Sequence, residues 1–196
     1  MKAVSSVEEL RFEGRRVKLR SILEKDFSTL LNWRNDVSDL MLWSSARAVI
    51  PESAYVEELQ SDYKQGLCRL GVEDKRTGEL VGHVFAYGYS EQNAHAYFGI
   101  YICRDNRESR IGFEATALFI KYMFAYFSLT KVYFDVFEYN LRSAILLEKA
   151  GLHKEGDFKK HIQYNGRAWS MYRYALYRED LGRVKRYLDW FTRLKS

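Results

Sequence analysis

The stretch CRDNRESRIGFEA (residues 103–115) follows an apolar run typical of a β-strand, HAYFGIYI (95–102), and leads into a segment of helical periodicity. A loop between a strand and a helix N-terminus can bind an anion, because the first backbone N–H groups of a helix are unpaired and its dipole adds partial positive charge. This loop holds a single glycine, Gly112, and carries Arg107 and Arg110. The stretch therefore suits either a phosphate-binding loop, built from N–H groups and arginines more than from glycines, or an ordinary polar turn between a strand and a helix.

Downstream of this loop, helices and strands alternate. Apolar residues recur at helical spacing over 111–126, which predicts a helix. KVYFDVFEYN (131–140) is typical of a strand, and LRSAILLEKAGL (141–152) predicts a short helix. Two further strands are predicted around Asn165-Gly166, because this dipeptide is favoured in two-residue hairpin turns.

Upstream of the loop, the pattern begins with a strand over 17–22. Two helices are predicted over 24–36 and 50–66, the second with Pro51 in its first turn. The segment 67–87 predicts two strands joined by a KRTG turn. The predicted order is strand, two helices, three strands, helix, strand, helix, two strands and a final helix, which indicates a mixed α/β domain with a largely antiparallel sheet.

Composition and charge indicate one globular domain over residues 1–196. Hydrophobic residues make up 47% of the chain and aromatic residues 16%, which argues against extensive disorder. The net charge of +5 suits an anionic ligand such as a nucleotide or coenzyme A, and equally a generic basic surface. No nucleic-acid-binding motif is recognisable, so we expect no nucleic-acid partner. The segment 179–196 predicts an amphipathic basic helix that docks on the domain or on a dimer partner, with a ribosome-binding helix as the alternative.

Other classes of protein are not expected. Cys68 and Cys103 lie in strand-like runs and predict free thiols rather than a disulfide framework. The apolar segment 117–129 is shorter than the roughly 20 residues of a membrane span, and Lys121 interrupts it. No His, Cys or Asp cluster has metal-ligand spacing, so we expect no metal. With no signal-peptide pattern at its start, we expect a soluble, cytoplasmic protein without a membrane partner.

The element order, the loop and the segment EYNLRSAILLEKAGLHKEGDF (138–158) resemble the GNAT superfamily of acetyl-CoA-dependent N-acetyltransferases. Within it, the chain is most similar to RimJ/RimL-like ribosomal-protein alanine acetyltransferases and their spermidine acetyltransferase relatives. The resemblance implies an α/β (α+β) GNAT fold: a mostly antiparallel central sheet of about seven strands with a splayed parallel pair, flanked by helices, plus an extra C-terminal helix. It also implies an acyltransferase with acetyl-CoA as cosubstrate, and homodimers are common among such relatives.

The cofactor loop of the resembled family reads Arg/Gln-x-x-Gly-x-Gly/Ala. This sequence matches it at Arg107 and Gly112 and departs from it at Arg110. We expect Arg110 to take ordinary helical or turn backbone angles and to add a cationic contact. By the same resemblance, the strand before the loop pairs with the pantetheine arm and holds the oxyanion through backbone groups. The expected cofactor-binding residues are Tyr101, Ile102, Cys103, Arg107, Glu108, Ser109, Arg110, Ile111, Gly112, Phe113, Asn140 and Ser143.

A second cofactor element follows the next strand. The resemblance implies that Asn140 contacts the pantetheine or acetyl region, and its position also predicts a helix N-cap, so both roles can coexist. Many of these enzymes protonate the leaving thiolate with a tyrosine, where this chain has Leu147. Ser143 can take over that proton transfer, or the thiolate can leave without an acid.

Four residues are candidates for activating the amine. Asp135 comes first, because its strand position carries a catalytic glutamate in alanine N-terminal acetyltransferases; the alternative is a structural carboxylate paired with Lys or Arg. His95 is the second candidate and His161 the third, although a lone histidine on a strand is more often structural. Tyr97 shares a strand face with His95 and is a candidate for positioning a water.

The resemblance implies an acceptor site in the region of the two predicted N-terminal helices. Trp33, Arg34, Trp43 and Arg47 are candidates to line it together with Tyr97, while both tryptophans also suit a hydrophobic core. The preferred acceptor is a protein N-terminus or a small amine, and the net positive charge argues against a polyamine. An amino-sugar acceptor, a polyamine acceptor and a degenerate domain that binds CoA without catalysis remain alternatives.

Overall fold

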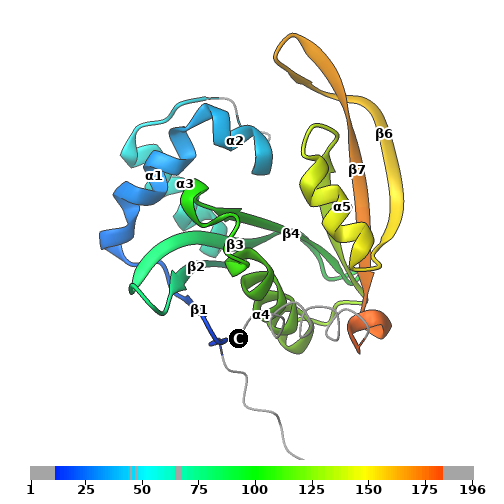
Figure 1. Cartoon of the computed structure of the whole chain (residues 1–196), viewed down its shortest axis with the longest axis horizontal. Coiled ribbons are helices and arrows are strands. Elements are labelled where there is room, and N and C mark those ends of the chain that lie inside the picture. The colour runs from blue at the N-terminus through cyan, green and yellow to red at the C-terminus, as the bar shows by residue number, and fades with distance from the viewer. Residues whose placement is uncertain (1–11, 45, 47, 65–67, 183–196) are drawn as a thin grey trace, which may run out of the picture.

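The computed structural model describes residues 12–44, 46, 48–64 and 68–182, which form a seven-stranded sheet with helices on both faces (Figure 1). The strands are β1 (Val17–Arg20), β2 (Arg69–Asp74), β3 (Glu79–Ser90), β4 (His95–Ile102), β5 (Lys131–Phe137), β6 (His153–Tyr164) and β7 (Arg167–Tyr177). The helices are α1 (Phe27–Asn35), α2 (Val37–Trp43), α3 (Glu52–Lys64), α4 (Ile111–Tyr126) and α5 (Leu141–Lys149).

The strands lie in the order β1-β2-β3-β4-β5-β7-β6, and every neighbouring pair is antiparallel except β4 and β5. The parallel pair is hydrogen-bonded only at one end, from His95–Lys131 to Tyr97–Tyr133, and then diverges. The predicted mixed, mostly antiparallel sheet of about seven strands with a splayed parallel pair is confirmed. The divergence opens the sheet at its centre.

On one face, α4 and α5 cover the sheet and enclose the larger hydrophobic core. Phe98 of β4 packs between Phe119 of α4 and Phe134 of β5, with ring centroids 5.8 and 5.0 Å away. Because side chains alternate along a strand, the residues beside these core positions point to the opposite face. The diverging strands therefore present different side chains to the two sides of the opening.

On the opposite face, α1, α2 and α3 pack over β2, β3 and β4. Leu30 of α1 and Tyr55 and Leu59 of α3 form a second small core. Two helices were predicted in this region, and that prediction is wrong by one element. The chain takes extended angles at Asp36, whose side chain accepts hydrogen bonds from the first N–H groups of α2, so α1 ends and a separate helix begins.

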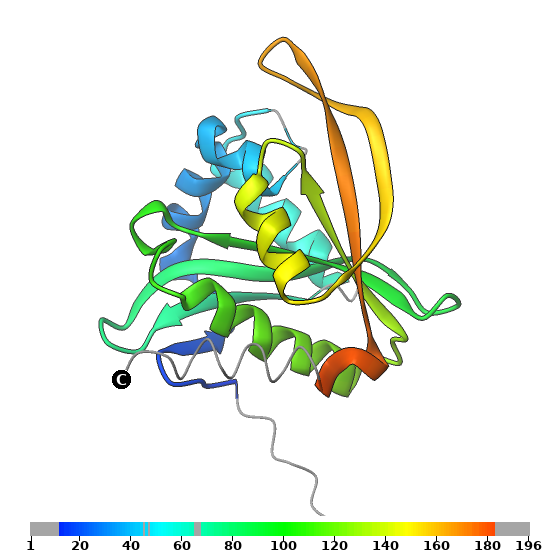
Figure 2. The ribbon, with the colours of Figure 1, turned by 45° about the vertical axis from the view of Figure 1, so that its right-hand side comes forward.

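The C-terminal part of the described chain is a long hairpin of β6 and β7, which extends beyond the rest of the sheet (Figure 2). Asn165 and Gly166 at its tip have φ of 55° and 73°, as the predicted two-residue turn requires. The predicted helix over 179–196 falls almost entirely outside the described residues. No helix in the described ranges is long and apolar enough to cross a membrane.

Candidate active site

A cavity of about 470 Å³ passes through the sheet where β4 and β5 diverge. Its walls include Phe134 and Val136, which face α4 and α5, and also Asp135, which points to the opposite side because it lies between them on β5. Leu42 and Trp43 at the end of α2 line the cavity on that opposite side. The cavity thus connects the N-terminus of α4 with the face that carries the N-terminal helices.

The end of the cavity beside α4 is suited to an anion. The backbone N–H groups of Phe113 and Glu114 donate to the carbonyl of Arg110, whereas those of Ile111 and Gly112 donate to no described residue. Unpaired N–H groups at the first turn of a helix are available to a phosphate. The side chains of Arg107, Arg110 and Arg142 line the same cavity and add positive charge.

Arg110 takes a left-handed backbone conformation, with φ of 66° and ψ of −1°. The expectation of ordinary helical or turn angles at this residue is wrong. The chain must reverse between the 3-10 turn Arg104–Asn106 and the start of α4, and the residue that caps α4 takes the left-handed angles that glycine adopts easily. For an arginine this conformation costs about 1–2 kcal/mol.

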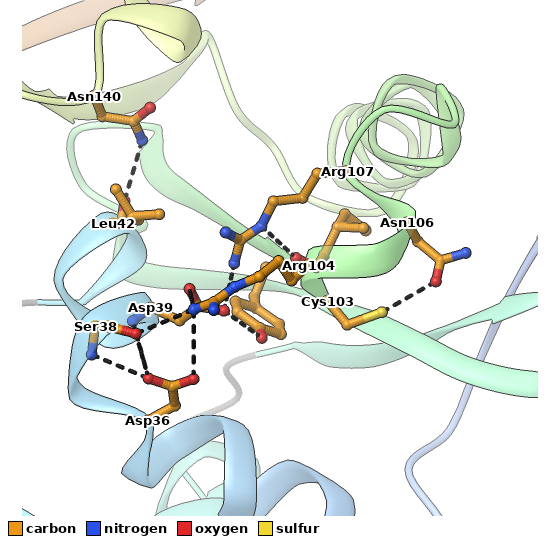
Figure 3. A network of polar contacts seen from close by, with 11 residues as sticks. Asp36, Ser38, Asp39, Leu42, Cys103, Arg104, Asn106, Arg107 and Asn140 are labelled. Carbon is orange, nitrogen blue, oxygen red and sulfur yellow. Dashed lines mark hydrogen bonds and ion pairs between the residues drawn. The ribbon is translucent and has the colours of Figure 1, made fainter.

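Two nitrogens of the Arg107 guanidinium form hydrogen bonds within the protein (Figure 3). Its Nε donates to the carbonyl of Ile102 at 3.0 Å, and its Nη2 donates to the carboxylate of Asp39 in α2 at 2.6 Å. Its Nη1 donates to no described residue, so one nitrogen remains available on the side chain that lines the cavity. The loop arginine is therefore anchored to α2.

The other expected cofactor residues separate into two groups. Those that line the cavity are Tyr101, Ile102, Gly112, Phe113, Asn140 and Ser143. Outside the lining, Ile111 is fully buried in the core, and Cys103 uses its N–H on the carbonyl of Val81 and its Sγ on Asn106. The hydroxyl of Ser109 donates to the carbonyl of Asn106.

Glu108 forms an exposed ion pair with Arg142, whose guanidinium also donates to the carbonyl of Arg107. Arg142 lines the cavity, and sequence reasoning missed it. Its position in the sequence was a signal, because it lies between two residues that were selected, the α5 cap Asn140 and Ser143. Through Arg142, the first turn of α5 is connected to the loop that precedes α4.

Asn140 caps α5, as predicted: its Oδ1 accepts from the N–H of Ser143 at 3.4 Å. Its Nδ2 donates to the carbonyl of Leu42 at 3.3 Å, so the same amide also fixes the end of α2. Leu147 lines the cavity one turn beyond Ser143, at the position where the resemblance places a tyrosine. The hydroxyl-bearing residue on this wall is therefore Ser143.

Of the candidate bases, Asp135 lines the cavity. Its two carboxylate oxygens accept hydrogen bonds from Nε and Nη2 of Arg173 at 2.7 and 2.8 Å. Asp135 is therefore paired with an arginine, as the alternative of a structural carboxylate predicted. A carboxylate has further lone pairs, so this pairing leaves acceptor sites on both oxygens. The arginine in turn lies 4.7 Å from the ring centroid of Tyr97.

The candidate histidines are not among the residues that line the cavity. His95 lies at the closed end of the parallel pair, with its ring 5.3 Å from that of Tyr133. His161 lies on exposed β6 and contacts Phe158. Their catalytic assignment stays a prediction without support from this geometry. Among the described residues, no three His, Cys, Asp or Glu side chains form a group that could hold a metal ion.

The expected acceptor residues are also divided. Trp43 lines the cavity, and its ring packs against His83, Phe85 and Tyr101. Trp33 instead packs on Tyr101 from α1, outside the lining.

Arg34 is buried and donates to the carbonyl of Ala48 and to Glu58, which indicates a structural role. Arg47 lies outside the described residues. Tyr97 stacks on Tyr87 and is not among the lining residues.

Tyr87 is a cavity residue that sequence reasoning missed. Its signal was the alternation of aromatic side chains along β3, where His83 and Phe85 precede it on the same face. Burial, followed by the negative charge of Asp135, raises the pKa of the Tyr87 phenol. The side chain therefore keeps its proton and can donate a hydrogen bond near Asp135.

Comparison with known proteins agrees with this architecture. Residues 16–153 match the family described as Acetyltransferase (GNAT) domain. The chain is 23% identical over 172 residues to the Uncharacterized N-acetyltransferase YnaD of Bacillus subtilis (strain 168), an alignment that covers 85% of this chain and 96% of that protein. It is 35% identical over 113 residues to the Probable N-acetyltransferase YjcK of the same organism, which covers 57% of this chain and 61% of that protein.

Among solved structures, the fold matches spermidine N-acetyltransferase from Vibrio cholerae in complex with CoA and spermine, with a TM-score of 0.79 and 20% identity. That match covers 86% of this chain and 99% of the other. The family match spans the diverging strands, the loop between them and all of α5. The chain belongs to the acetyltransferase (GNAT) family and is an acyltransferase.

Proposed function

We propose that this protein is an N-acetyltransferase that moves the acetyl group of acetyl-CoA to the primary amine of a protein N-terminus or of a small amine. The observation that carries the proposal is the cavity through the diverging strands β4 and β5. It has unpaired helix N–H groups and arginines at one end, and Trp43, Tyr87 and Asp135 at the other. Such a passage lets an anionic cosubstrate and an amine approach from opposite faces of the sheet.

In this proposal the pyrophosphate of acetyl-CoA lies at the N-terminus of α4, near Gly112, Arg110 and Arg142. The pantetheine arm follows the exposed edge of β4, and the thioester reaches the opening of the sheet. The amine nitrogen attacks the thioester carbon from the side of Trp43 and Tyr87. A C–N bond forms and the C–S bond breaks, which releases CoA as a thiolate.

Two protons then have to move. The attacking nitrogen loses one, and Asp135 is the proposed acceptor, directly or through a water, because it is the carboxylate that lines the acceptor end. The thiolate gains one, for which Ser143 is the proposed donor on the α5 wall. The hydroxyl of Tyr87 is placed to hold the amine in position beside Asp135.

The charges around the cavity favour an acceptor with one amine. A polyamine carries several ammonium groups, and each needs an opposing carboxylate when it leaves water. Among the described lining residues, Asp135 is the sole acid and is already paired with Arg173, whereas three arginines line the same cavity. The Vibrio cholerae neighbour was crystallised with spermine. A single acid that is already paired supports a monoamine and, with it, the RimJ/RimL-like assignment.

A thiol-release assay on the full chain tests this function. We expect acetyl transfer from acetyl-CoA to peptides with a free N-terminus or to small monoamines, with kcat/KM at least about tenfold above that for spermidine, or about 1.4 kcal/mol in transition-state free energy. Asp135→Asn and Ser143→Ala should each lower kcat. A preference for spermidine would contradict the monoamine acceptor and indicate a polyamine acceptor instead. CoA binding without turnover on any amine would favour a non-catalytic domain.

A further inference from the structure

The buried carboxylate of Asp39 is the centre of a polar network between α2 and the loop that precedes α4 (Figure 3). The residue is 4% exposed and lies in the first turn of α2. It accepts hydrogen bonds from the hydroxyl of Tyr101 at 3.0 Å, from Arg104 at 2.9 Å and from Arg107 at 2.6 Å. Burial alone would raise the pKa of Asp39, but these hydrogen bonds outweigh it and hold the pKa below its ordinary value. The carboxylate therefore stays charged and keeps all three donors.

The other end of α2 is bound to the opposite arm of the sheet opening. The hydroxyl of Tyr139 donates to the carbonyl of Met41 at 2.6 Å, and Asn140 donates to the carbonyl of Leu42. Both donors lie between β5 and α5. A helix of seven residues is thus tied at its start to the loop after β4 and at its end to the segment after β5. We call this set of contacts the α2 bridge.

The α2 bridge connects the two ends of the cavity. At the loop end it holds Arg107, which lines the anion-binding side. At the other end it carries Leu42 and Trp43, which line the acceptor side. Because so short a helix moves as one piece, a shift of Arg107 on phosphate binding has to be accompanied by a shift of Trp43 or by loss of the contact to Asp39.

We propose that Asp39 is a positioning residue that couples the binding of acetyl-CoA to the binding of the amine. This inference rests on the proposed function and adds to it a residue that touches neither the cosubstrate nor the reacting atoms. Its consequence is positive cooperativity: CoA at the loop end holds α2 in the position that shapes the acceptor end. By linkage, the amine raises the affinity for CoA by the same factor.

The variant Asp39→Asn tests the proposal, because it removes the charge and preserves the size of the side chain. The readout is the affinity of the amine with the highest kcat/KM in the thiol-release assay, measured by calorimetry with and without saturating CoA, which cannot transfer an acetyl group. In the wild type we expect CoA to tighten amine binding about fivefold or more, the usual lower range of such coupling. In Asp39→Asn this ratio should fall close to one, and KM for acetyl-CoA should rise about tenfold with kcat changed far less.

A matched control lies three residues earlier on the same helix. Asp36 caps α2 and is exposed, and its Oδ2 lies 3.7 Å from Nη2 of Arg104, which is beyond hydrogen-bond distance. Asparagine caps helices as well as aspartate does, so Asp36→Asn should retain the wild-type coupling ratio. Should Asp39→Asn fail to fold, Tyr101→Phe removes one of the three donors, preserves the ring, and should lower the ratio in part.

The outcomes separate the two proposals. A wild-type coupling ratio in Asp39→Asn, or in Tyr101→Phe where only that variant folds, would overturn the positioning role and leave the acetyltransferase function standing. A wild-type protein that binds CoA and amine independently would overturn it as well. Absence of CoA binding to the wild type would instead remove the proposed function on which the coupling rests.

Discussion

Arg110 combines a strained backbone with a charge at the mouth of the cavity. Its φ of 66° is a conformation in which glycine has no steric cost. We expect Arg110→Gly to stabilise the ligand-free protein by about 1 kcal/mol, which corresponds to a rise of roughly 2–4 °C in Tm for a chain of this size. The same change should weaken acetyl-CoA binding several-fold, because it removes a cation from the anion-binding end. Thermal melts and titration calorimetry measure the two effects.

Arg110→Ala is the matched control for this prediction. Alanine loses the charge but retains a Cβ in the left-handed conformation, so its Tm should not rise while its acetyl-CoA affinity falls as in Arg110→Gly. A lower Tm for Arg110→Gly than for Arg110→Ala would contradict the assignment of strain. Unchanged affinity in both variants would contradict the role of the guanidinium.

His83 is a fully buried histidine on β3, stacked between Phe85 and Tyr101. Burial, together with the charge of nearby Arg69, holds its pKa well below the ordinary value of 6.5. The unfolded chain therefore binds a proton here below about pH 6.5 that the folded chain does not, so this residue makes stability fall as pH falls. We expect His83→Phe to remove this contribution, which amounts to up to about 1.4 kcal/mol per pH unit.

Urea unfolding of wild type and His83→Phe between pH 7 and pH 5 checks the sign and the size. Above pH 6.5 the two proteins should differ by a constant amount, and below it the wild type should lose free energy of unfolding faster. Parallel pH dependences of the two proteins over the whole range would show that His83 titrates alike in the folded and unfolded states.

At the scale of elements, Asn140 has two separable functions. It caps α5, and its amide also contacts Leu42 and lines the cavity. Asn140→Ala should cost about 1 kcal/mol of stability through the lost cap, whereas Asn140→Ser should restore the cap. Neither variant supplies the amide, so both should lower kcat/KM for acetyl transfer about tenfold or more. Full activity in Asn140→Ser would show that Asn140 acts only as the helix cap and that its amide is not needed for acetyl transfer.

A comparison of the elements shows which sequence signals are sufficient to predict a helix or a turn. The hairpin turn at Asn165-Gly166 and the apolar periodicity of α4 are local, and both were predicted with nearly the observed bounds. Helix α2 was missed because seven residues are too few for a periodic pattern to stand out. Its start did carry a local signal: Asp36 as a cap, with Asp39 as an acid three residues later.

The conformation of Arg110 was mispredicted for a different reason. Local propensity disfavours left-handed angles in an arginine, and the surrounding structure imposes them where the chain enters α4. The contacts of the α2 bridge were beyond sequence reasoning because their partners are distant. Asp39 and Arg107 are 68 positions apart, and Tyr139 and Met41 are 98 apart. Only the folded sheet brings them together.

At the scale of the whole molecule, the central feature is the opening between β4 and β5. The strand order places the parallel pair of β4 and β5 in the middle of the sheet, and the pair separates after Tyr97 and Tyr133. The helix that follows β4 directs its unpaired N–H groups at one side of this opening, and α2 covers the other side. The splayed parallel pair was expected from the family resemblance and not from the hydrophobic pattern, because local sequence does not determine which strands become neighbours.

Titration of acetyl-CoA into the full chain by calorimetry tests the account most directly. We predict binding with Kd near micromolar, about −8 kcal/mol, and at least tenfold weaker binding to Arg110→Glu. Arg76→Glu, an identical charge change at the exposed turn between β2 and β3, should bind like the wild type. No binding to the wild type, or equal binding to both variants, would contradict the claim that the anion-binding end of this cavity holds acetyl-CoA.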